Sequence, residues 1–402
     1  MWRIGFFFHE MGFGLLSVFL PLYVITSRGG TLYDIGIMAS LALLLAIPGS
    51  FLWGYLCDKT RRYKLYVLVS FSASAAILYL FTYSPSVVWL IVLYGVMSFI
   101  HVAHEPPRNV LIAELYSHPD WERHFAFYEG FTEGGWLIGL LLGFFMSTYQ
   151  LGPTVTLFVC SGLNLMAFVL SVIFVKDPAL LFERSVVSIE RTVDFASRGI
   201  FVASRVLDGA PMTEKLKKEN VNAFCLGLIL FSLATSILFT PMPVFISERV
   251  QLAGLPAGIV FAVFVLSSTG AVAGYALAGS RSGQSEGKPR LGRIVLLRSL
   301  FAFLLISAIS VSGFEAVGLA TPILILMGFL YAMFLVRTLS LSMEIIPSGQ
   351  SGLFNVLAGI GGVCGSFLGP FLAEFFGASG FLSVFIVAGV IFLLAYVVFS
   401  VY

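Results

Sequence analysis

The stretch Gly54-Tyr55-Leu56-Cys57-Asp58-Lys59-Thr60-Arg61-Arg62-Tyr63-Lys64 places five charged residues between two long apolar runs. A charge at the centre of a lipid bilayer costs about 2.5–3.5 kcal/mol on insertion scales, so this stretch cannot lie at depth. It predicts a short connection at a membrane surface that joins two membrane-spanning helices.

The composition of the whole chain also favours a membrane protein. Of its 402 residues, 58% are hydrophobic and 11% are charged, whereas a soluble protein is about 25% charged. The four cysteines lie in or beside apolar runs without paired spacing, so we expect neither disulfides nor zinc ligands. The first apolar run holds Glu10 and Pro21 and lacks a small-residue cleavage site, which favours a retained span over a signal peptide.

Twelve apolar runs are long enough to span a bilayer, since a helix needs about 20 residues to cross about 30 Å of hydrocarbon. They cover 4–26, 33–56, 65–83, 86–114, 124–148, 154–175, 221–247, 256–279, 293–312, 316–338, 350–376 and 380–402. The longer connection 176–220 separates a first bundle at 1–175 from a second at 221–402. Its apolar residues recur every three or four positions from Val186 to Leu207, which predicts an amphipathic helix on the cytoplasmic face; a partly ordered tether is the alternative.

The distribution of lysine and arginine predicts the orientation. With a cytoplasmic N-terminus, 21 of the 23 basic residues, Arg298 among them, fall on the cytoplasmic face, and only Arg28 and Arg249 fall outside. We therefore expect both termini in the cytoplasm and the plasma membrane as the location.

The two halves of the chain repeat each other. Leu20-Pro21-Leu22-Tyr23-Val24-Ile25 matches Met242-Pro243-Val244-Phe245-Ile246, at an offset of 222 residues. Glycines at 135, 139 and 143 match those at 361, 365 and 369, at an offset of 226 residues. The similar offsets indicate a collinear duplication, and small residues at this spacing permit close helix packing.

Motif, span count and duplication together resemble the major facilitator superfamily, whose loop between helices 2 and 3 runs roughly G-x-L-a-D-r-x-G-r-k. The pattern is matched by Gly54, Leu56, Asp58, Lys59, Arg62 and Lys64, while Arg61 stands where the family usually has glycine. The resemblance covers the whole chain. It implies an all-α integral membrane protein with twelve transmembrane helices in two pseudo-symmetric six-helix bundles, and a substrate site between them.

The resemblance also implies a gating network at the cytoplasmic side. Glu114 looks like the acid that ends helix 4 in this family, and is expected to pair with Arg61 or Arg62. Asp58 is expected to face the N-terminal end of helix 11, where the helix dipole stabilises a carboxylate. Such a network would lock the outward-open state. Ordinary surface charges that only set the orientation are the alternative.

Ionisable residues inside spans are functional candidates, because their burial is expensive. They concentrate in the first half, namely His9, Glu10, His101, His104, Glu105, Arg108, Glu129 and Glu133, whereas matching positions of the second half hold Ser232, Met327 and Asn355. A carboxyl group in low dielectric and a histidine can both exchange protons in the physiological range. We expect the substrate cavity and proton coupling to use Glu10, His9, His101, Glu105 and Glu133. Alternatively, Glu105, Glu129 and Glu133 pair with Arg108, Arg123 or the loop cations.

The sequence contains no nucleotide-binding loop, nucleophile elbow or metalloprotease motif, so we expect neither an enzyme nor a cofactor. We expect a secondary active transporter, an antiporter that exports a small, partly apolar organic solute by alternating access in exchange for protons. Its partners would be this substrate, protons and the lipid bilayer, with no nucleic acid and no resident metal, and the chain would be a monomer.

Two departures from the family's proton-driven drug antiporters weaken the antiporter assignment. Tyr94 stands where many of them carry arginine, and Phe144 stands where they carry proline. Three alternatives stay open. They are proton-coupled uptake of a metabolite, export of a divalent metal bound by histidines and glutamates of spans 1 and 4, and a membrane sensor that transports nothing.

Overall fold

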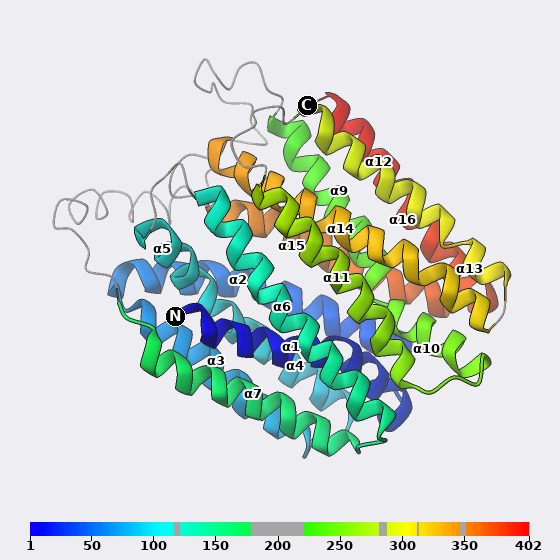
Figure 1. Ribbon diagram of the computed structural model, residues 1–402, viewed down its shortest axis with the longest axis horizontal. Coiled ribbons are helices and arrows are strands. Elements are labelled where there is room, and N and C mark those ends of the chain that lie inside the picture. Colours follow the sequence, from blue (N-terminus) through cyan, green and yellow to red (C-terminus); the bar gives the residue numbers. More distant parts are fainter. Residues whose placement is uncertain (116–120, 178–220, 281–287, 312, 346–350, 402) are drawn as a thin grey trace.

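The computed structural model describes residues 1–115, 121–177, 221–280, 288–311, 313–345 and 351–401 (Figure 1). The regular structure in these ranges is helical: α1 (Arg3–Arg28), α2 (Leu32–Thr60), α3 (Tyr63–Phe81), α4 (Val87–His101), η1 (Val102–His104), α5 (Glu105–Leu115), α6 (Trp121–Thr148), α7 (Pro153–Phe174), α9 (Val221–Phe239), α10 (Met242–Leu252), α11 (Gly258–Ser280), α12 (Lys288–Leu304), α13 (Ser307–Ser310), α14 (Phe314–Ile345), α15 (Ser351–Phe375), η4 (Gly377–Ser379) and α16 (Gly380–Val401).

Twelve helical segments of this described part are long and apolar enough to cross a membrane, with α4–α5, α9–α10 and α12–α13 each counted as one. The predicted number of spans is therefore confirmed. The amphipathic helix predicted within 176–220 lies outside the described residues, which stop at 177 and resume at 221.

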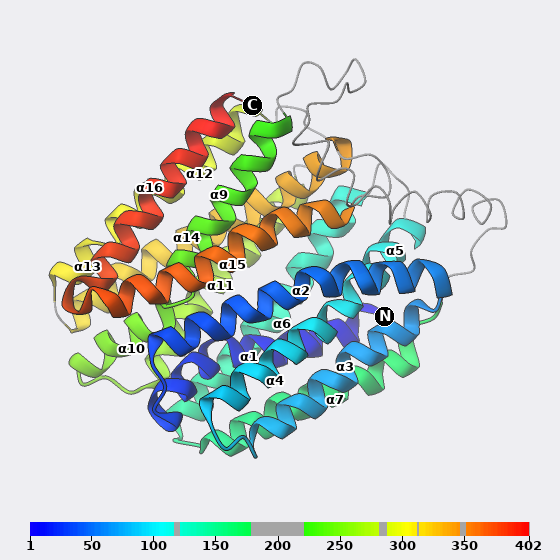
Figure 2. The same ribbon diagram turned by 180° about the vertical axis from the view of Figure 1, so that it is seen from behind.

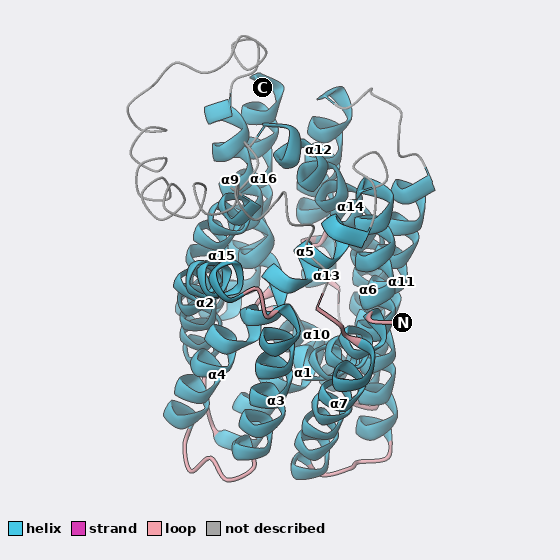
Figure 3. Ribbon diagram, turned by 90° about the vertical axis from the view of Figure 1, so that its left-hand side faces the viewer, coloured by secondary structure: helices cyan, strands magenta, loops and turns pink. Residues whose placement is uncertain are grey.

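The helices form two groups with the same internal packing (Figures 1 and 2). In the first group α1 packs on α6 and α7, α3 on α7, and α2 on α4. In the second group the equivalent pairs recur, with α9 on α15 and α16, α12 on α16, and α11 on α14. Figure 3 shows α3 and α7 on one side of the molecule and α9, α12 and α16 on the other. The predicted pair of pseudo-symmetric six-helix bundles is confirmed.

Most of the contact between the bundles comes from two helix pairs, α2 with α15 and α6 with α11. Near the start of α2, the Leu32 backbone N–H donates to Glu374 Oε2 at 3.1 Å. Two turns further along, Ser40 Oγ donates to the carbonyl of Val363 at 2.8 Å. The helix groups diverge from this end of the molecule toward the end that holds both termini (Figure 1). The hydrogen bonds of Leu32 and Ser40 therefore join the bundles toward the end away from the termini.

Glycines set the closest helix contacts within each bundle. A Cβ atom on Gly139 of α6 would collide with the carbonyl oxygen of Met11 on α1, and one on Gly365 of α15 with that of Leu233 on α9. The close packing predicted from the repeated glycines is thus present at equivalent places in both halves.

The charged stretch that follows the second span is mostly helical. Helix α2 continues to Thr60, beyond its predicted end at 56, and α3 begins at Tyr63, so only Arg61 and Arg62 connect the two helices. Arg61 has φ 55° and its N–H donates to the carbonyl of Cys57 at 2.8 Å. This left-handed conformation ends many helices and is adopted most easily by glycine, which explains the residue usual at this position in the family.

The fourth span is not the single helix predicted over 86–114. Helix α4 ends at His101, a 3-10 turn covers Val102–His104, and α5 begins at Glu105. Pro106 and Pro107 follow, and proline has no N–H to donate to the carbonyl one turn earlier. The seventh span is likewise divided, between α9 and α10, at Pro241. The two prolines after His101 therefore account for the break beside the predicted site.

Candidate functional site

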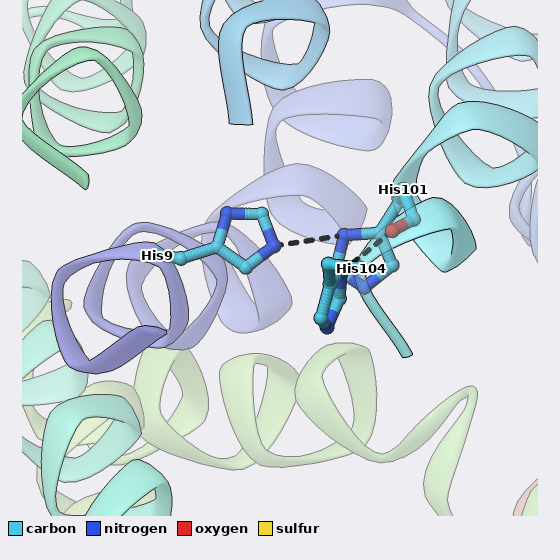
Figure 4. Close-up of side chains that lie close together, drawn as sticks. All are labelled: His9, His101 and His104. Atoms are coloured by element: carbon cyan, nitrogen blue, oxygen red, sulfur yellow. Dashed lines mark hydrogen bonds between the residues drawn. The ribbon is translucent and has the colours of Figure 1, made fainter. Parts of the chain in front are cut away.

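Three histidines of the first bundle lie together where α1 meets the break in the fourth span (Figure 4). His9 Nε2 lies 3.0 Å from His101 Nδ1, and His9 Nδ1 lies 2.6 Å from Asn164 Oδ1 on α7. Asn164 Nδ2 donates to the carbonyl of Cys160 at 2.9 Å, so its Oδ1 faces the histidine as an acceptor. In the neutral ring, His9 Nδ1–H then donates to Asn164, and His9 Nε2 accepts from His101 Nδ1–H.

The third histidine, His104, bonds to a backbone carbonyl at the break in the fourth span. The carbonyl of His101 accepts from His104 Nδ1 at 2.6 Å and from Ser70 Oγ at 2.7 Å. These bonds leave the Nε2 atoms of His101 and His104 as lone-pair acceptors when both rings are neutral. His9 and His104 are buried and His101 is half-buried. The histidines therefore form a bonded chain from the α7 amide to a partly exposed ring.

Aromatic rings enclose this chain. His9 stacks on Phe71 with ring centroids 4.2 Å apart, and His101 lies 4.4 Å from Phe13. Phe6 lies edge-on to His104 at 5.8 Å. These apolar walls cover most of His9 and His104, whereas His101 remains partly exposed.

Four carboxyl groups and one guanidinium lie beside the histidines. Arg108 Nη1 lies 3.6 Å from Glu129 Oε1, and each side chain is 19% exposed. Glu10 and Glu105 lie within electrostatic range of this pair, and Glu10 also within range of Glu133. Glu10 is half-buried and makes no hydrogen bond with any residue that the structure describes. One guanidinium cannot balance four carboxylates, so the group is chemically suited to hold protons.

The alternative in which the glutamates pair with cations applies to Glu129 but not to Glu133. Glu133 Oε1 accepts a 2.6 Å hydrogen bond from Ser268 Oγ, which belongs to α11 of the second bundle. One predicted site residue thus contacts the opposite half directly.

The three histidines have the ligand type for a divalent metal. Their nearest ring nitrogens all lie within 4.8 Å of one another, whereas the nitrogens around a tetrahedral zinc lie about 3.3 Å apart, given bonds of about 2.0–2.1 Å. Both nitrogens of His9 are already hydrogen-bonded. The cluster therefore fits a metal only if the His9–His101 bond opens and the rings close by more than about 1 Å.

The predicted gating residues lie at the end that holds the termini. Among the described contacts, Lys64 bonds to α7 and to the segment that follows it. The Lys64 backbone N–H donates to Asp177 Oδ1 at 2.8 Å, and Lys64 Nζ to the carbonyl of Val172 at 2.5 Å. Asp58 and Arg62 are exposed. A Cβ atom added to Gly54 would have no neighbouring atom of the described residues within 4 Å. The side chain of Glu114 lies outside those described, so its pairing with Arg61 or Arg62 stays a prediction.

Four residues of the structure were not predicted as site residues. Asn164 and Ser268 are neutral, and nothing in their spacing marks them as partners of ionisable groups. Arg298, predicted at the cytoplasmic face, is instead fully buried inside the second bundle beside Tyr331. Its position five residues inside the predicted span 293–312 was the signal against a surface location.

A groove of about 790 Å³ lies on the first bundle, away from these residues. Its lining is almost wholly apolar and comes from α2, α3 and α4: Leu45, Trp53, Val69, Ser72, Ala73, Ala76, Val96, Phe99 and Ile100. An apolar lining of this kind is typical of a surface that faces lipid, and it brings none of the ionisable residues together.

Comparisons with known proteins match the chain as a whole. The family model described as Major Facilitator Superfamily matches residues 4–363. Among solved structures, the nucleoside transporter NupG is 12% identical with a TM-score of 0.73, and the alignment covers 99% of this chain and 97% of that one. A proton-dependent oligopeptide transporter is 14% identical with a TM-score of 0.76, covering 100% and 97%. The human organic anion transporter MFSD10 (TETRAN) is 18% identical with a TM-score of 0.67, covering 99% and 97%. No curated protein sequence matches the chain.

Proposed function

Because the chain belongs to the major facilitator superfamily, we propose that it is a secondary transporter that exports a small, partly apolar organic solute in exchange for protons. Membership of the family and twelve apolar helices make it a multi-pass membrane transporter and not an enzyme. The class of solute, the direction of transport and the coupling to protons belong to the proposal.

The observation that carries proton coupling is the asymmetry of the two bundles. In the first, three histidines, four glutamates and Arg108 lie in mutual contact or electrostatic range at membrane depth. At the equivalent places the second bundle has a buried Met327 and Ser232, whose hydroxyl donates to the carbonyl of Ala358. Intramembrane ionisable residues are retained where they take part in ion or substrate pathways. A contiguous group of them in one half supports a proton site there.

The similar structures support an organic solute. Their titles name a nucleoside transporter, a proton-dependent oligopeptide transporter and an organic anion transporter. At 12–18% identity the likeness concerns the fold, so these titles support an organic solute without specifying its class.

We infer that both termini face the cytoplasm of a cell whose plasma membrane holds the protein as a monomer, with 176–220 as linker between the bundles 1–175 and 221–402. The described conformation, joined at the far end by Leu32–Glu374, is then inward-open. In the outward-open state Asp58 would meet the start of α15, and Arg61 or Arg62 would meet Glu114. Asp58→Asn is expected to slow transport while leaving substrate binding intact.

Calorimetry on the purified protein tests the coupling without knowledge of its direction. A thermal-shift screen of metabolites and drugs at two pH values first identifies a ligand, because binding to the folded state raises its stability. The heat of binding in buffers of different ionisation enthalpy then gives the number of protons exchanged. Exchange transport requires the solute and the proton to compete, so we expect proton release and tighter binding at higher pH. Proton uptake on binding would favour coupled import, and no proton change would exclude coupling.

A divalent metal is a second candidate for the transported species, because the nearest ring nitrogens of His9, His101 and His104 lie within 4.8 Å of one another. Titration with Co²⁺ distinguishes the two, since a site of three histidines gives a visible absorption band that His101→Phe abolishes. Absence of the band in wild-type protein would remove the metal candidate. Arg108, a fixed cation in electrostatic range of His101, opposes metal binding.

A further inference from the structure

Arg298 on α12 is fully buried, and none of its three guanidinium nitrogens has a hydrogen-bond partner among the described residues. A guanidinium carries five N–H donors and keeps its charge at neutral pH. A buried charge normally persists only with a counter-charge or a full set of hydrogen bonds. The N–H groups of Arg298 are therefore available to a ligand, since none of the described residues accepts a hydrogen bond from them.

Four aromatic rings surround the guanidinium. Its Cζ lies 4.9 Å from the ring centroid of Phe231, 5.0 Å from Phe392, 5.4 Å from Tyr331 and 5.7 Å from Phe239. Ring faces attract a cation, which compensates part of its burial, but they accept few of its N–H hydrogens. We call these four residues and Arg298 the aromatic cage.

One wall of the cage differs from the others. Phe231 and Phe392 are buried and Phe239 is half-buried, whereas Tyr331 on α14 is 37% exposed. Tyr331 also lies within electrostatic range of Glu129 and Glu133, and α14 contacts α6. The partly exposed wall thus faces the first bundle, across the space between the halves in which transporters of this fold bind their substrates. A rotation of the Tyr331 side chain would uncover the guanidinium toward that space.

The chemistry of the cage selects its ligand. Guanidinium donors match the two oxygens of a carboxylate, and a bidentate pair of this kind is stronger than a neutral hydrogen bond. The surrounding rings suit an apolar or aromatic body attached to that carboxylate. We propose that Arg298 and the aromatic cage form a subsite for the carboxylate of an amphipathic organic anion. The proposal rests on the proposed transport of a partly apolar organic solute and adds the charge of that solute.

Benzoate and its neutral counterpart benzamide test this subsite on the purified full-length protein. We expect benzoate to raise the unfolding temperature with a saturable concentration dependence, and benzamide to raise it less at equal concentration. Sodium chloride at the same ionic strength controls for a general salt effect. Equal shifts from benzoate and benzamide, or from benzoate and chloride, would overturn the assignment.

Two substitutions locate the effect. Arg298→Met fills a similar volume without charge, and should weaken benzoate binding about tenfold or more, while Arg293→Met, at an exposed arginine of the same helix, should leave it unchanged. Arg298→Lys keeps the buried charge but loses the planar fork, so it should bind benzoate more weakly than wild type. Should Arg298→Met not fold, undiminished benzoate binding by Arg298→Lys contradicts the subsite.

The outcomes separate this subsite from proton coupling, because the thermal titration needs no proton gradient. Benzoate binding that depends on Arg298, without proton exchange in the calorimeter, would leave the subsite standing and remove the coupling. If benzoate does not bind and Arg298→Met leaves proton-coupled transport unchanged, the coupling would stand and the subsite would be removed.

Discussion

Glu133 on α6 accepts a 2.6 Å hydrogen bond from Ser268 on α11, and this bond joins the polar cluster of the first bundle to the second bundle. Alternating access requires the two bundles to tilt against each other. An ionised carboxylate accepts this bond more strongly than a protonated one, so under the proposed function the bond would couple protonation of Glu133 to the relative position of the halves.

Ser268→Ala is expected to shift the equilibrium away from the described conformation. Loss of about 1 kcal/mol, usual for one hydrogen bond, changes a two-state equilibrium about fivefold. Spin labels at Lys59→Cys and Arg293→Cys, both exposed, report the separation of the bundles. The background needs Cys364→Ser, because Cys364 is exposed while the other three cysteines are buried. The short-distance population should grow in Ser268→Ala.

Ser267→Ala is the matched control for this shift. Ser267 donates to the carbonyl of Leu324 within the second bundle, so its removal should leave the distance distribution unchanged. Equal distributions in wild type and Ser268→Ala would show that the bond has no part in the balance between conformations.

Glu10→Gln separates proton exchange from structure, because glutamine keeps the size of the side chain but cannot release a proton. We expect this variant to bind substrate, to lose accumulation driven by a pH gradient, and to lose much of the pH dependence of its affinity. Liposome uptake with and without a gradient measures accumulation, and substrate titrations at two pH values measure binding and its pH dependence. Glu315→Gln, at an exposed position at the start of α14, is the control. Gradient-driven accumulation by Glu10→Gln at normal protein levels would shift the assignment to Glu105 or Glu133.

Asn164→Ala removes the acceptor that fixes the tautomer of His9. A buried donor left without a partner costs about 1–3 kcal/mol, so the unfolding temperature should fall. The pH profile of substrate binding should also move, since His9 Nε2 is then no longer held as the acceptor for His101. Ser161→Ala, which removes a bond from α7 to the carbonyl of Ala75, should lower stability without moving the profile. An unmoved profile in Asn164→Ala would exclude the histidine chain from coupling.

Arg61→Gly should be more stable than Arg61→Ala by about 1 kcal/mol, because the left-handed backbone penalises any Cβ. The comparison removes the arginine side chain from both variants, so only the backbone effect remains. Lys59 lies inside α2, where glycine is the poorer residue, so Lys59→Gly should be less stable than Lys59→Ala. Thermal unfolding in detergent measures the four variants. The same order at both positions would contradict the conformation of Arg61.

Impermeant maleimide tests the predicted orientation. In the Cys364→Ser background, Ser27→Cys should react on intact cells, and Lys59→Cys only after the membrane is made permeable. Both positions are exposed, so access to the reagent is not limited by burial. The reverse pattern would place the termini outside.

Periodic and repeated features were predictable from the sequence, whereas side-chain partners were not. Hydropathy gives the twelve spans because lipid forces every backbone group into helical bonds, and the repeated glycines give the packing pairs because close approach needs missing side chains. Pro106 and Pro107 indicate the break after His101, but the single span predicted over 86–114 took no account of them. The bonds His9–Asn164 and Glu133–Ser268 join residues 155 and 135 positions apart, and no local pattern encodes such pairs.

The collision that a Cβ on Gly139 or Gly365 would produce also bears on how this chain can vary. Backbone atoms of α1 and α9 occupy the space, so no side chain can yield to make room. A library that samples every amino acid at every position should therefore retain only glycine at these two sites, although both lie in helices where alanine is otherwise preferred. Positions such as Leu44 or Val88, whose exposed apolar side chains suit lipid, should accept most hydrophobic residues. The narrowest constraints on sequence divergence would thus include positions that carry no polar group themselves.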